Sequence, residues 1–204
     1  MPEAAALVSS GRWNEWTALE PIRPLSECTL GLVGLGRIGR ELLRQIGGLF
    51  GRTLAHDPYA VDLLPAGTTH TDLDDLIARS DVLSLHCPLT PDTRHIIGRD
   101  RLALMPPGSL LVNVARGGLV DTAALLDALD KRRPSAAALD VLETEPPRHG
   151  APVIDHPRIL HTPHVAWYST EAAGRLRTSL AHRCASHLIG RPGATVVNPQ
   201  AEGV

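Results

Sequence analysis

Three polar side chains in the second half of the sequence follow short apolar segments and have types suited to acid–base chemistry. Arg116 follows the segment that ends at Asn113, and a guanidinium can bind a carboxylate or polarise a carbonyl through forked hydrogen bonds. His164 follows a later apolar segment, and an imidazole can donate a proton near neutral pH. Glu145, in an acidic stretch, is our candidate for the carboxylate that supports this histidine.

Each of these residues also has an ordinary explanation. Arg116 can be a solvent-exposed arginine, Glu145 part of an acidic surface loop, and His164 one of ten histidines that merely caps a turn. Taken singly, these explanations are favoured over catalysis. All three residues, however, follow strand-like segments, and ligands of open α/β sheets gather at the carboxyl ends of strands. Their common placement therefore favours a functional site.

The apolar segments belong to a regular alternation of short apolar runs and longer amphipathic ones that starts at Thr29. This alternation predicts β-α-β units around a parallel sheet, with strands apolar enough to be covered on both faces. The fold class we predict is α/β, a Rossmann-type doubly wound parallel sheet with helices on both faces, in a single domain. We expect strands at 29–33, 52–56, 82–85, 109–113, 136–139 and 159–161, and helices at 37–49, 72–78, 122–131 and 170–189.

A glycine-rich turn joins the first expected strand to the first expected helix. Gly34, Gly36 and Gly39 have the GxGxxG spacing in the strand–turn–helix context that raises this pattern above coincidence. The first glycine permits a tight turn, the second lets the backbone approach a pyrophosphate, and the third lets helix and strand pack closely. Free amides at the helix start favour negative charge. The alternative is a glycine-rich turn without a ligand.

Asp57 ends the next expected strand, about 20 residues beyond the turn, where a carboxylate can accept hydrogen bonds from both ribose hydroxyls. A 2'-phosphate would meet like charge there, and the following Pro58 and Tyr59 provide no arginine to compensate it. This arrangement favours NAD as the cofactor. The alternative for Asp57 is a loop or helix-capping carboxylate.

Composition excludes several other classes of protein. Acidic and basic residues are interleaved to a net charge of -2, so we expect no direct nucleic-acid partner. Cys28, Cys87 and Cys184 lack any CxxC spacing, which predicts no disulfide framework and no metal site. No segment resembles a signal peptide or a membrane span. We therefore expect a cytoplasmic protein without a membrane partner.

Longer motifs identify a family. The segments 32–39 (LVGLGRIG), 86–90 (HCPLT), 112–121 (VNVARGGLVD) and 138–146 (ALDVLETEP) resemble the D-isomer-specific 2-hydroxyacid dehydrogenases. The resemblance runs from about Gly11 to Asn198, nearly the whole chain. It implies an NAD-dependent oxidoreductase that transfers a hydride between NAD(H) and a small 2-oxo or 2-hydroxy acid.

The resemblance also implies roles for individual residues. Arg116 would hold and polarise the 2-oxo acid, His164 would be the general acid/base, and Glu145 the carboxylate that tunes it. Asp140 would contact the nicotinamide carboxamide. The residues implied in cofactor binding are Gly34, Gly36, Arg37, Ile38, Gly39, Asp57, His86, Cys87, Pro88, Thr93, Val114, Ala115, Arg116, Asp140 and His164.

The final motif, His164 to Ser169 (HVAWYS), is most similar to the C-terminal-binding protein branch of the family. In that branch a tryptophan at the position of Trp167 lines the substrate pocket, which would favour an apolar 2-oxo acid. An equally good explanation of Trp167 is an anchor on the domain surface.

Family members place a substrate domain before the glycine turn, whereas this sequence has only about 30 residues there. We therefore expect residues 1–28 to be an extension, 29–190 the NAD-binding domain and 191–204 a tail that resembles the family's usual ending. The cofactor site is expected to be intact, but turnover by this chain alone is in question, because half a cleft neither excludes water nor fixes the substrate. A truncated gene start, a domain supplied in trans and a non-catalytic remnant are the alternatives.

The family also implies a homodimer formed through this domain, with residues 11–16 as a contributor. Two functions other than catalysis remain open. One is a corepressor-like interaction module whose oligomeric equilibrium shifts with NAD(H). The other is an inactive fragment.

Overall fold

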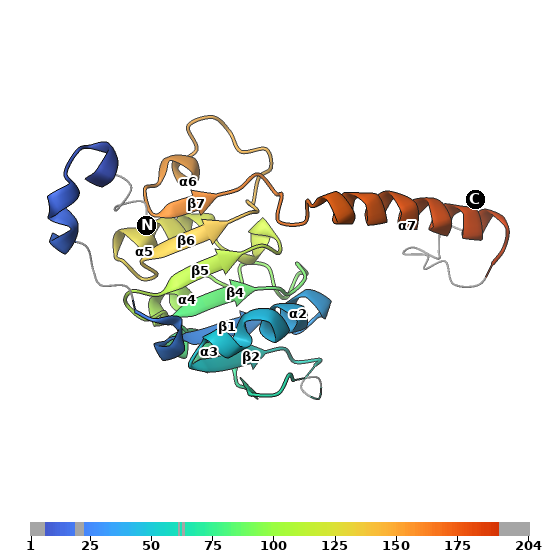
Figure 1. The fold of residues 1–204 in the computed structure, drawn as a ribbon, viewed down its shortest axis with the longest axis horizontal. Coiled ribbons are helices and arrows are strands. Elements are labelled where there is room, and N and C mark those ends of the chain that lie inside the picture. Colours follow the sequence, from blue (N-terminus) through green and yellow to red (C-terminus); the bar gives the residue numbers. More distant parts are fainter. Residues whose placement is uncertain (1–6, 19–22, 61, 63, 192–204) are drawn as a thin grey trace. The chain divides into compact units, whose positions relative to one another are not determined.

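A computed structural model of the chain describes residues 7–18, 23–60, 62 and 64–191 (Figure 1). Within these residues, seven parallel strands form one sheet in the order β3-β2-β1-β4-β5-β6-β7. The strands are β1 (Thr29–Val33), β2 (Arg52–His56), β3 (Thr68–His70), β4 (Val82–Leu85), β5 (Leu110–Asn113), β6 (Ala136–Leu139) and β7 (Ile159–His161). The strand order reverses between β1 and β4, and ligands of doubly wound sheets bind at the carboxyl ends of the strands beside such a point.

The connections between strands contain α2 (Arg37–Ile46), α3 (Leu73–Arg79), α4 (Arg99–Leu104), α5 (Thr122–Asp130) and α6 (Pro152–Asp155). Short 3₁₀ turns lie at Trp13–Ala18, Leu25–Glu27, Gly47–Leu49 and Gly117–Leu119. The predicted fold class is confirmed. The sequence did not predict β3, α4 and α6, because β3 is Thr-Thr-His without an apolar run and the two helices are too short to show a helical repeat.

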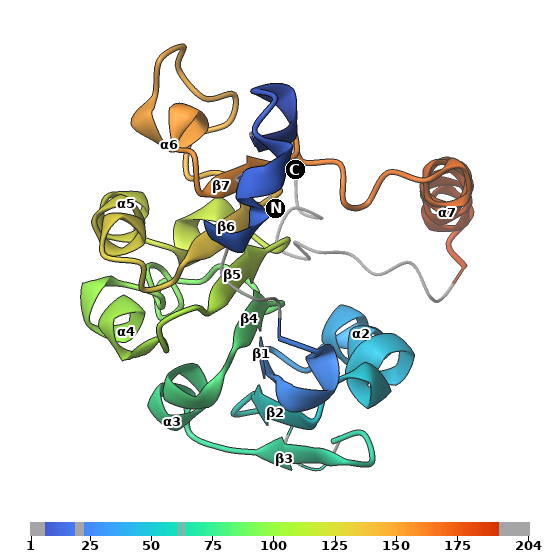
Figure 2. The same ribbon diagram turned by 60° about the vertical axis from the view of Figure 1, so that its left-hand side comes forward.

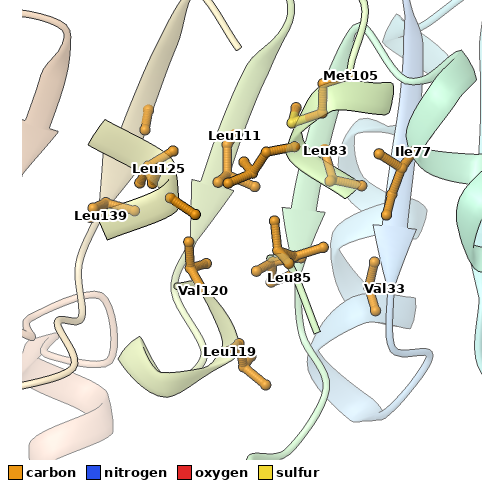
Figure 3. Packing of buried hydrophobic residues seen from close by; sticks show 14 of the residues in the cluster. Val33, Ile77, Leu83, Leu85, Met105, Leu111, Leu119, Val120, Leu125 and Leu139 are labelled. Carbon is orange, nitrogen blue, oxygen red and sulfur yellow. The ribbon is translucent and has the colours of Figure 1, made fainter. Parts of the chain in front are cut away.

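Of the helices between the strands, α2 lies on one face of the sheet, and α3, α4 and α5 form a layer on the other (Figure 2). On one face, Leu43 of α2 packs with Leu30 and Leu32 of β1. On the other face, α3, α4 and α5 cover a larger cluster in which Leu125 of α5 lies near Leu111 of β5 (Figure 3). Full burial of each such leucine stabilises the fold by roughly 1.5–3 kcal/mol. The helices on the two faces hold the carboxyl ends of the strands in fixed positions.

Coverage differs between the two halves of the sheet. Leu54 and Ala55 of β2 point to opposite faces and are both fully buried. In β5 and β7, Leu111 and Ile159 are buried, but Leu110 and Leu160 are 42% and 64% exposed. The prediction that every strand is covered on both faces is therefore wrong for β5 and β7. Apolar composition alone does not reveal which face of a strand meets a helix.

The chain divides into two compact units, Met1–His164 and Val165–Val204. The second contains α7 (Thr170–Leu188), whose first turn is capped by Ser169, which accepts a hydrogen bond from the Ala172 amide at 3.0 Å. The expected domain 29–190 thus extends past this division. Of the expected tail 191–204, the residues after 191 lie outside the described residues.

No helix in the described ranges has the length and apolar content that crossing a membrane requires. The three cysteines are free thiols: Cys28 is buried, Cys87 half-buried and Cys184 exposed.

Candidate cofactor and active site

The glycine turn lies at the end of β1, beside the end of β4. Gly34 has a φ of +101°, and a Cβ on it would lie 2.6 Å from the backbone nitrogen of Cys87, so only glycine fits. A Cβ on Gly39 would lie 2.3 Å from the carbonyl oxygen of Gly34, which brings α2 close to β1. A Cβ on Gly36 would meet nothing within 4 Å. The backbone at Gly36 is therefore open to the approach of a phosphate group.

The start of α2 has the properties of an anion site. Gly36 occupies the N-cap position and has no side chain, so the first amides of the helix have no side-chain cap. Such amides, together with the helix dipole, favour negative charge. These are the features that a pyrophosphate of a dinucleotide needs.

Two cavities of about 720 and 580 Å³ begin at this turn and share Ile38 and His86 in their walls. The second extends to the segment after β5. Their walls contain nine of the predicted cofactor residues, namely Gly36, Arg37, Ile38, His86, Cys87, Pro88, Val114, Ala115 and Arg116. Residues from the ends of three strands thus line one continuous surface beside the glycine turn.

Asp57 follows β2 and is half-buried. Its Oδ2 accepts a hydrogen bond from the Leu35 amide at 2.7 Å, and its Oδ1 accepts one from the Tyr59 amide at 2.9 Å. Each carboxylate oxygen can accept a further hydrogen bond. Asp57 is therefore fixed beside the glycine turn and keeps the capacity to bind ribose hydroxyls.

The segment after β4 presents neutral groups. Burial lowers the pKa of His86, whose Nε2 lies 2.9 Å from Ser84 Oγ. Burial also raises the pKa of the Cys87 thiol to about 11. Thr93 shapes the loop that follows, because its hydroxyl donates to the Pro88 carbonyl at 2.7 Å. His86 and Cys87 can therefore contact a cofactor without charge.

Asn113 orders the segment that carries Arg116. Its Nδ2 donates to the Arg116 carbonyl at 2.9 Å, and its Oδ1 accepts from the Ala115 amide at 3.1 Å. The Arg116 side chain is exposed, with one guanidinium nitrogen 2.6 Å from the Ala115 carbonyl oxygen. Asn113 is only 1% exposed and was not among the predicted site residues. The signal for it was an amide side chain at the end of an otherwise apolar strand.

The structure brings Glu145 and His164 together, 19 residues apart in the chain. Glu145 Oε2 lies 2.7 Å from His164 Nδ1. Burial raises the pKa of Glu145, but hydrogen bonds from the Leu142 amide and from His164 outweigh it, so the pKa lies below its ordinary value. An ionised carboxylate only accepts hydrogen bonds, so Nδ1 carries the proton. Nε2 is then the nitrogen left to exchange a proton with a substrate.

Asp140 connects the ends of β6 and β7. Its side chain is 5% exposed and accepts a hydrogen bond from the Thr162 hydroxyl. Its carbonyl accepts from the His164 amide at 2.8 Å. His164 itself has a φ of +54°. Asp140 thus helps to hold the backbone at the catalytic candidate.

Trp167 lies in the second unit and is 50% exposed. Its ring makes an edge contact with Tyr168 at a centroid distance of 5.3 Å. A role in the substrate pocket stays a prediction, as do the roles of the other site residues.

The fold and the glycine turn define a dinucleotide-binding domain of the Rossmann type. A family model described as "D-isomer specific 2-hydroxyacid dehydrogenase, NAD binding domain" matches residues 1–166. The chain belongs to the D-isomer specific 2-hydroxyacid dehydrogenases and contains their NAD-binding domain. The expected likeness to the C-terminal-binding protein branch stays a prediction.

Known relatives agree with this assignment. The chain is 36% identical to the D-3-phosphoglycerate dehydrogenase of Methanocaldococcus jannaschii, over 97% of this chain and 38% of the relative. It is 38% identical to the glycerate dehydrogenase of Methylorubrum extorquens, over 91% and 59%. This chain therefore spans less than two thirds of the length of either relative.

Solved structures have the same fold. The D-lactate dehydrogenase of Treponema pallidum has a TM-score of 0.84 and 34% identity, with 95% of this chain and 62% of that chain covered. The D-isomer specific 2-hydroxyacid dehydrogenase of Lactobacillus delbrueckii ssp. bulgaricus, in its NAD complexed form, has a TM-score of 0.86 and 26% identity, with 97% and 63% covered.

Proposed function

We propose that this chain supplies the cofactor-binding part of an oxidoreductase that transfers a hydride between NAD(H) and a small 2-oxo or 2-hydroxy acid. The observation that carries the proposal is the 2.7 Å contact between His164 Nδ1 and Glu145 Oε2, in the same unit as the glycine turn. It pairs a proton donor with a dinucleotide site, as reduction of a carbonyl requires.

The residues that hold the cofactor are those of the turn and its surroundings. The amides at the start of α2 would bind the pyrophosphate beside Gly36, Asp57 would accept hydrogen bonds from the ribose, and Asp140 would contact the carboxamide. The chemistry that the cofactor would supply there is the donation or acceptance of a hydride.

The chemical step uses Arg116, His164 and Glu145. Arg116 binds the carboxylate of the 2-oxo acid and polarises its carbonyl. His164 donates a proton from Nε2 to the carbonyl oxygen, and the charge of Glu145 stabilises the imidazolium that does so. A contribution from Trp167 would favour apolar 2-oxo acids.

The absorbance of NADH, followed with a panel of 2-oxo acids, tests this function. Oxidation that depends on His164 is expected, with a loss of about 10²–10⁴-fold in kcat for His164→Ala. The assay is run on this chain and on the chain joined to the substrate domain of a relative. No oxidation in either form would overturn the proposal.

We also propose that the protein is a cytoplasmic homodimer. Free Cys28, Cys87 and Cys184 fit a reducing compartment. Leu110 and Leu160 leave aliphatic surface on one face of the sheet, and such surface favours protein contacts.

The same exposed face favours, as a second candidate function, an interaction module that senses NAD(H). Sedimentation with and without NADH distinguishes a constant homodimer from an NAD(H)-sensing module. A dimer whose mass does not depend on NADH supports the constant homodimer, and a mass that changes with NADH supports the sensing module.

A further inference from the structure

A second histidine–glutamate pair joins Glu143, in the same turn as Glu145, to His95 of another loop. His95 Nε2 is 2.6 Å from Glu143 Oε1, and Glu143 Oε2 accepts a hydrogen bond from the Thr122 amide at 3.0 Å. The two side chains are 38% and 25% exposed, so water screens their attraction only in part. Sequence analysis assigned neither residue a role.

This pair joins three segments that are distant in sequence. His95 follows the loop of Pro88 and Thr93, and its amide donates to the Gly118 carbonyl at 2.8 Å. Thr122 begins α5, whereas Glu143 follows β6. His95 has a φ of +52°, a left-handed conformation that a non-glycine residue keeps where its surroundings impose it. Contacts on several sides therefore hold the imidazole in place.

The acidic turn, residues 142–146, is held at both of its ends. At its base, a Cβ on Gly117 would lie 1.9 Å from the carbonyl carbon of Leu142, so the two segments are in direct contact. At its tip, Glu145 Oε1 accepts from the Leu142 amide at 2.8 Å while Oε2 faces His164. Glu143 lies between base and tip, and its contacts with His95 and Thr122 tie the middle of the turn to two further segments.

We propose that His95 and Glu143 are positioning residues that fix the acidic turn and thereby hold Glu145 against His164. The importance of this contact for catalysis rests on the proposed function. Glu143 and Glu145 are two residues apart, and each contacts its own histidine. Arg94 also faces Glu143, but at 4.0 Å and 62% exposed it interacts with this carboxylate more weakly than His95 does at 2.6 Å.

The pKa values of the two carboxyls agree with this arrangement. Burial raises the pKa of Glu143, but hydrogen bonds from Thr122 and His95 outweigh burial and leave it below its ordinary value. The pKa of Glu145 is lowered in the same way by the Leu142 amide and His164, against burial. Loss of His95 would therefore destabilise the charge on Glu143 and remove one of the contacts that hold the turn.

The test is an NMR titration of the isotope-labelled full chain, in which the carboxyl carbon resonance of Glu145 reports its pKa. In His95→Ala, the pKa of Glu145 is expected to rise toward 4.5, and the ring nitrogen resonance of His164 Nδ1 to lose its hydrogen-bonded position. His95→Gln places an amide nitrogen at similar reach and is expected to restore both signals. Asp127→Asn, which breaks the exposed Arg99–Asp127 pair, is the control and should change neither.

An unchanged Glu145 pKa and an unchanged His164 resonance in His95→Ala would overturn the proposal. Should His95→Ala fail to fold, the near-isosteric Glu143→Gln decides by the same two signals. The titration requires neither cofactor nor turnover. A chain that oxidises no NADH can therefore still support or contradict the positioning role, which separates its failure from failure of the proposed function.

Discussion

The glycine turn after β1 is shaped by backbone contacts, whereas the acidic turn after β6 combines one such contact, at Gly117, with two pairs of side chains. Gly34 and Gly39 leave no space for a Cβ, so the path of the chain follows from residue type alone. Glu143 and Glu145 instead depend on His95 and His164, which come from other loops. Local sequence therefore predicts the cofactor end of the site, residues 34–39 and Asp57, better than the chemical end, Glu145 and His164.

The largest expected effect of a substitution is at Gly34. Gly34→Ala adds a Cβ against the Cys87 amide in a left-handed backbone, and both strain and overpacking oppose it. We expect the free energy of unfolding to fall by about 3 kcal/mol, measured by urea denaturation. A loss below about 0.5 kcal/mol would mean that the turn is not rigid.

Gly36→Ala is the matched variant, because a Cβ there meets nothing within 4 Å. Stability is expected to change by less than about 0.5 kcal/mol. NADH binding, measured by fluorescence titration, should weaken about tenfold, or 1.4 kcal/mol, because the methyl group occupies the path of the pyrophosphate. Unchanged affinity would place the pyrophosphate elsewhere.

The acidic turn should make stability depend on pH. The pKa of Glu143 lies below 4.5 in the folded chain, so its contribution is present above that pH and is lost as pH falls through the folded value. Between about pH 6 and pH 3, the wild type should lose up to about 1 kcal/mol more than Glu143→Gln in thermal unfolding. Equal losses of stability in the wild type and in Glu143→Gln would show that the fold does not stabilise the ionised form of Glu143.

The smallest effect is expected at an exposed ion pair away from both turns. Arg99 Nη2 lies 2.8 Å from Asp127 Oδ2, and the two side chains are 63% and 55% exposed. Asp127→Asn should lower the free energy of unfolding by about 0.5 kcal/mol or less, measured by urea denaturation, because solvent screens the pair. A larger loss would mean that this exposed ion pair stabilises the fold as much as the pairs of the acidic turn do.

Features set by local sequence could be predicted, whereas contacts between distant segments could not. The alternation of apolar runs placed six strands, and the spacing of the glycines placed the start of α2. The amide at the end of an apolar strand was the only signal for Asn113, and it did not reveal that Asn113 orders the Arg116 segment. Nothing in the local pattern revealed that His95 meets Glu143, because these residues are 48 positions apart and their proximity depends on the fold. Exposure of Leu110 and Leu160 was missed because an apolar residue in a strand does not reveal whether a helix covers it.

Cofactor binding and proton transfer are assigned to different side chains of this chain, so substitution should separate them. NADH fluorescence titration of Asp57→Ala and His164→Ala, beside the unmodified chain, measures this separation. Asp57→Ala should weaken binding by about 1.5–3 kcal/mol through the loss of charge-assisted hydrogen bonds, whereas His164→Ala should bind almost as the unmodified chain does. Abolished binding in His164→Ala together with unchanged binding in Asp57→Ala would show that the cofactor does not bind at Asp57.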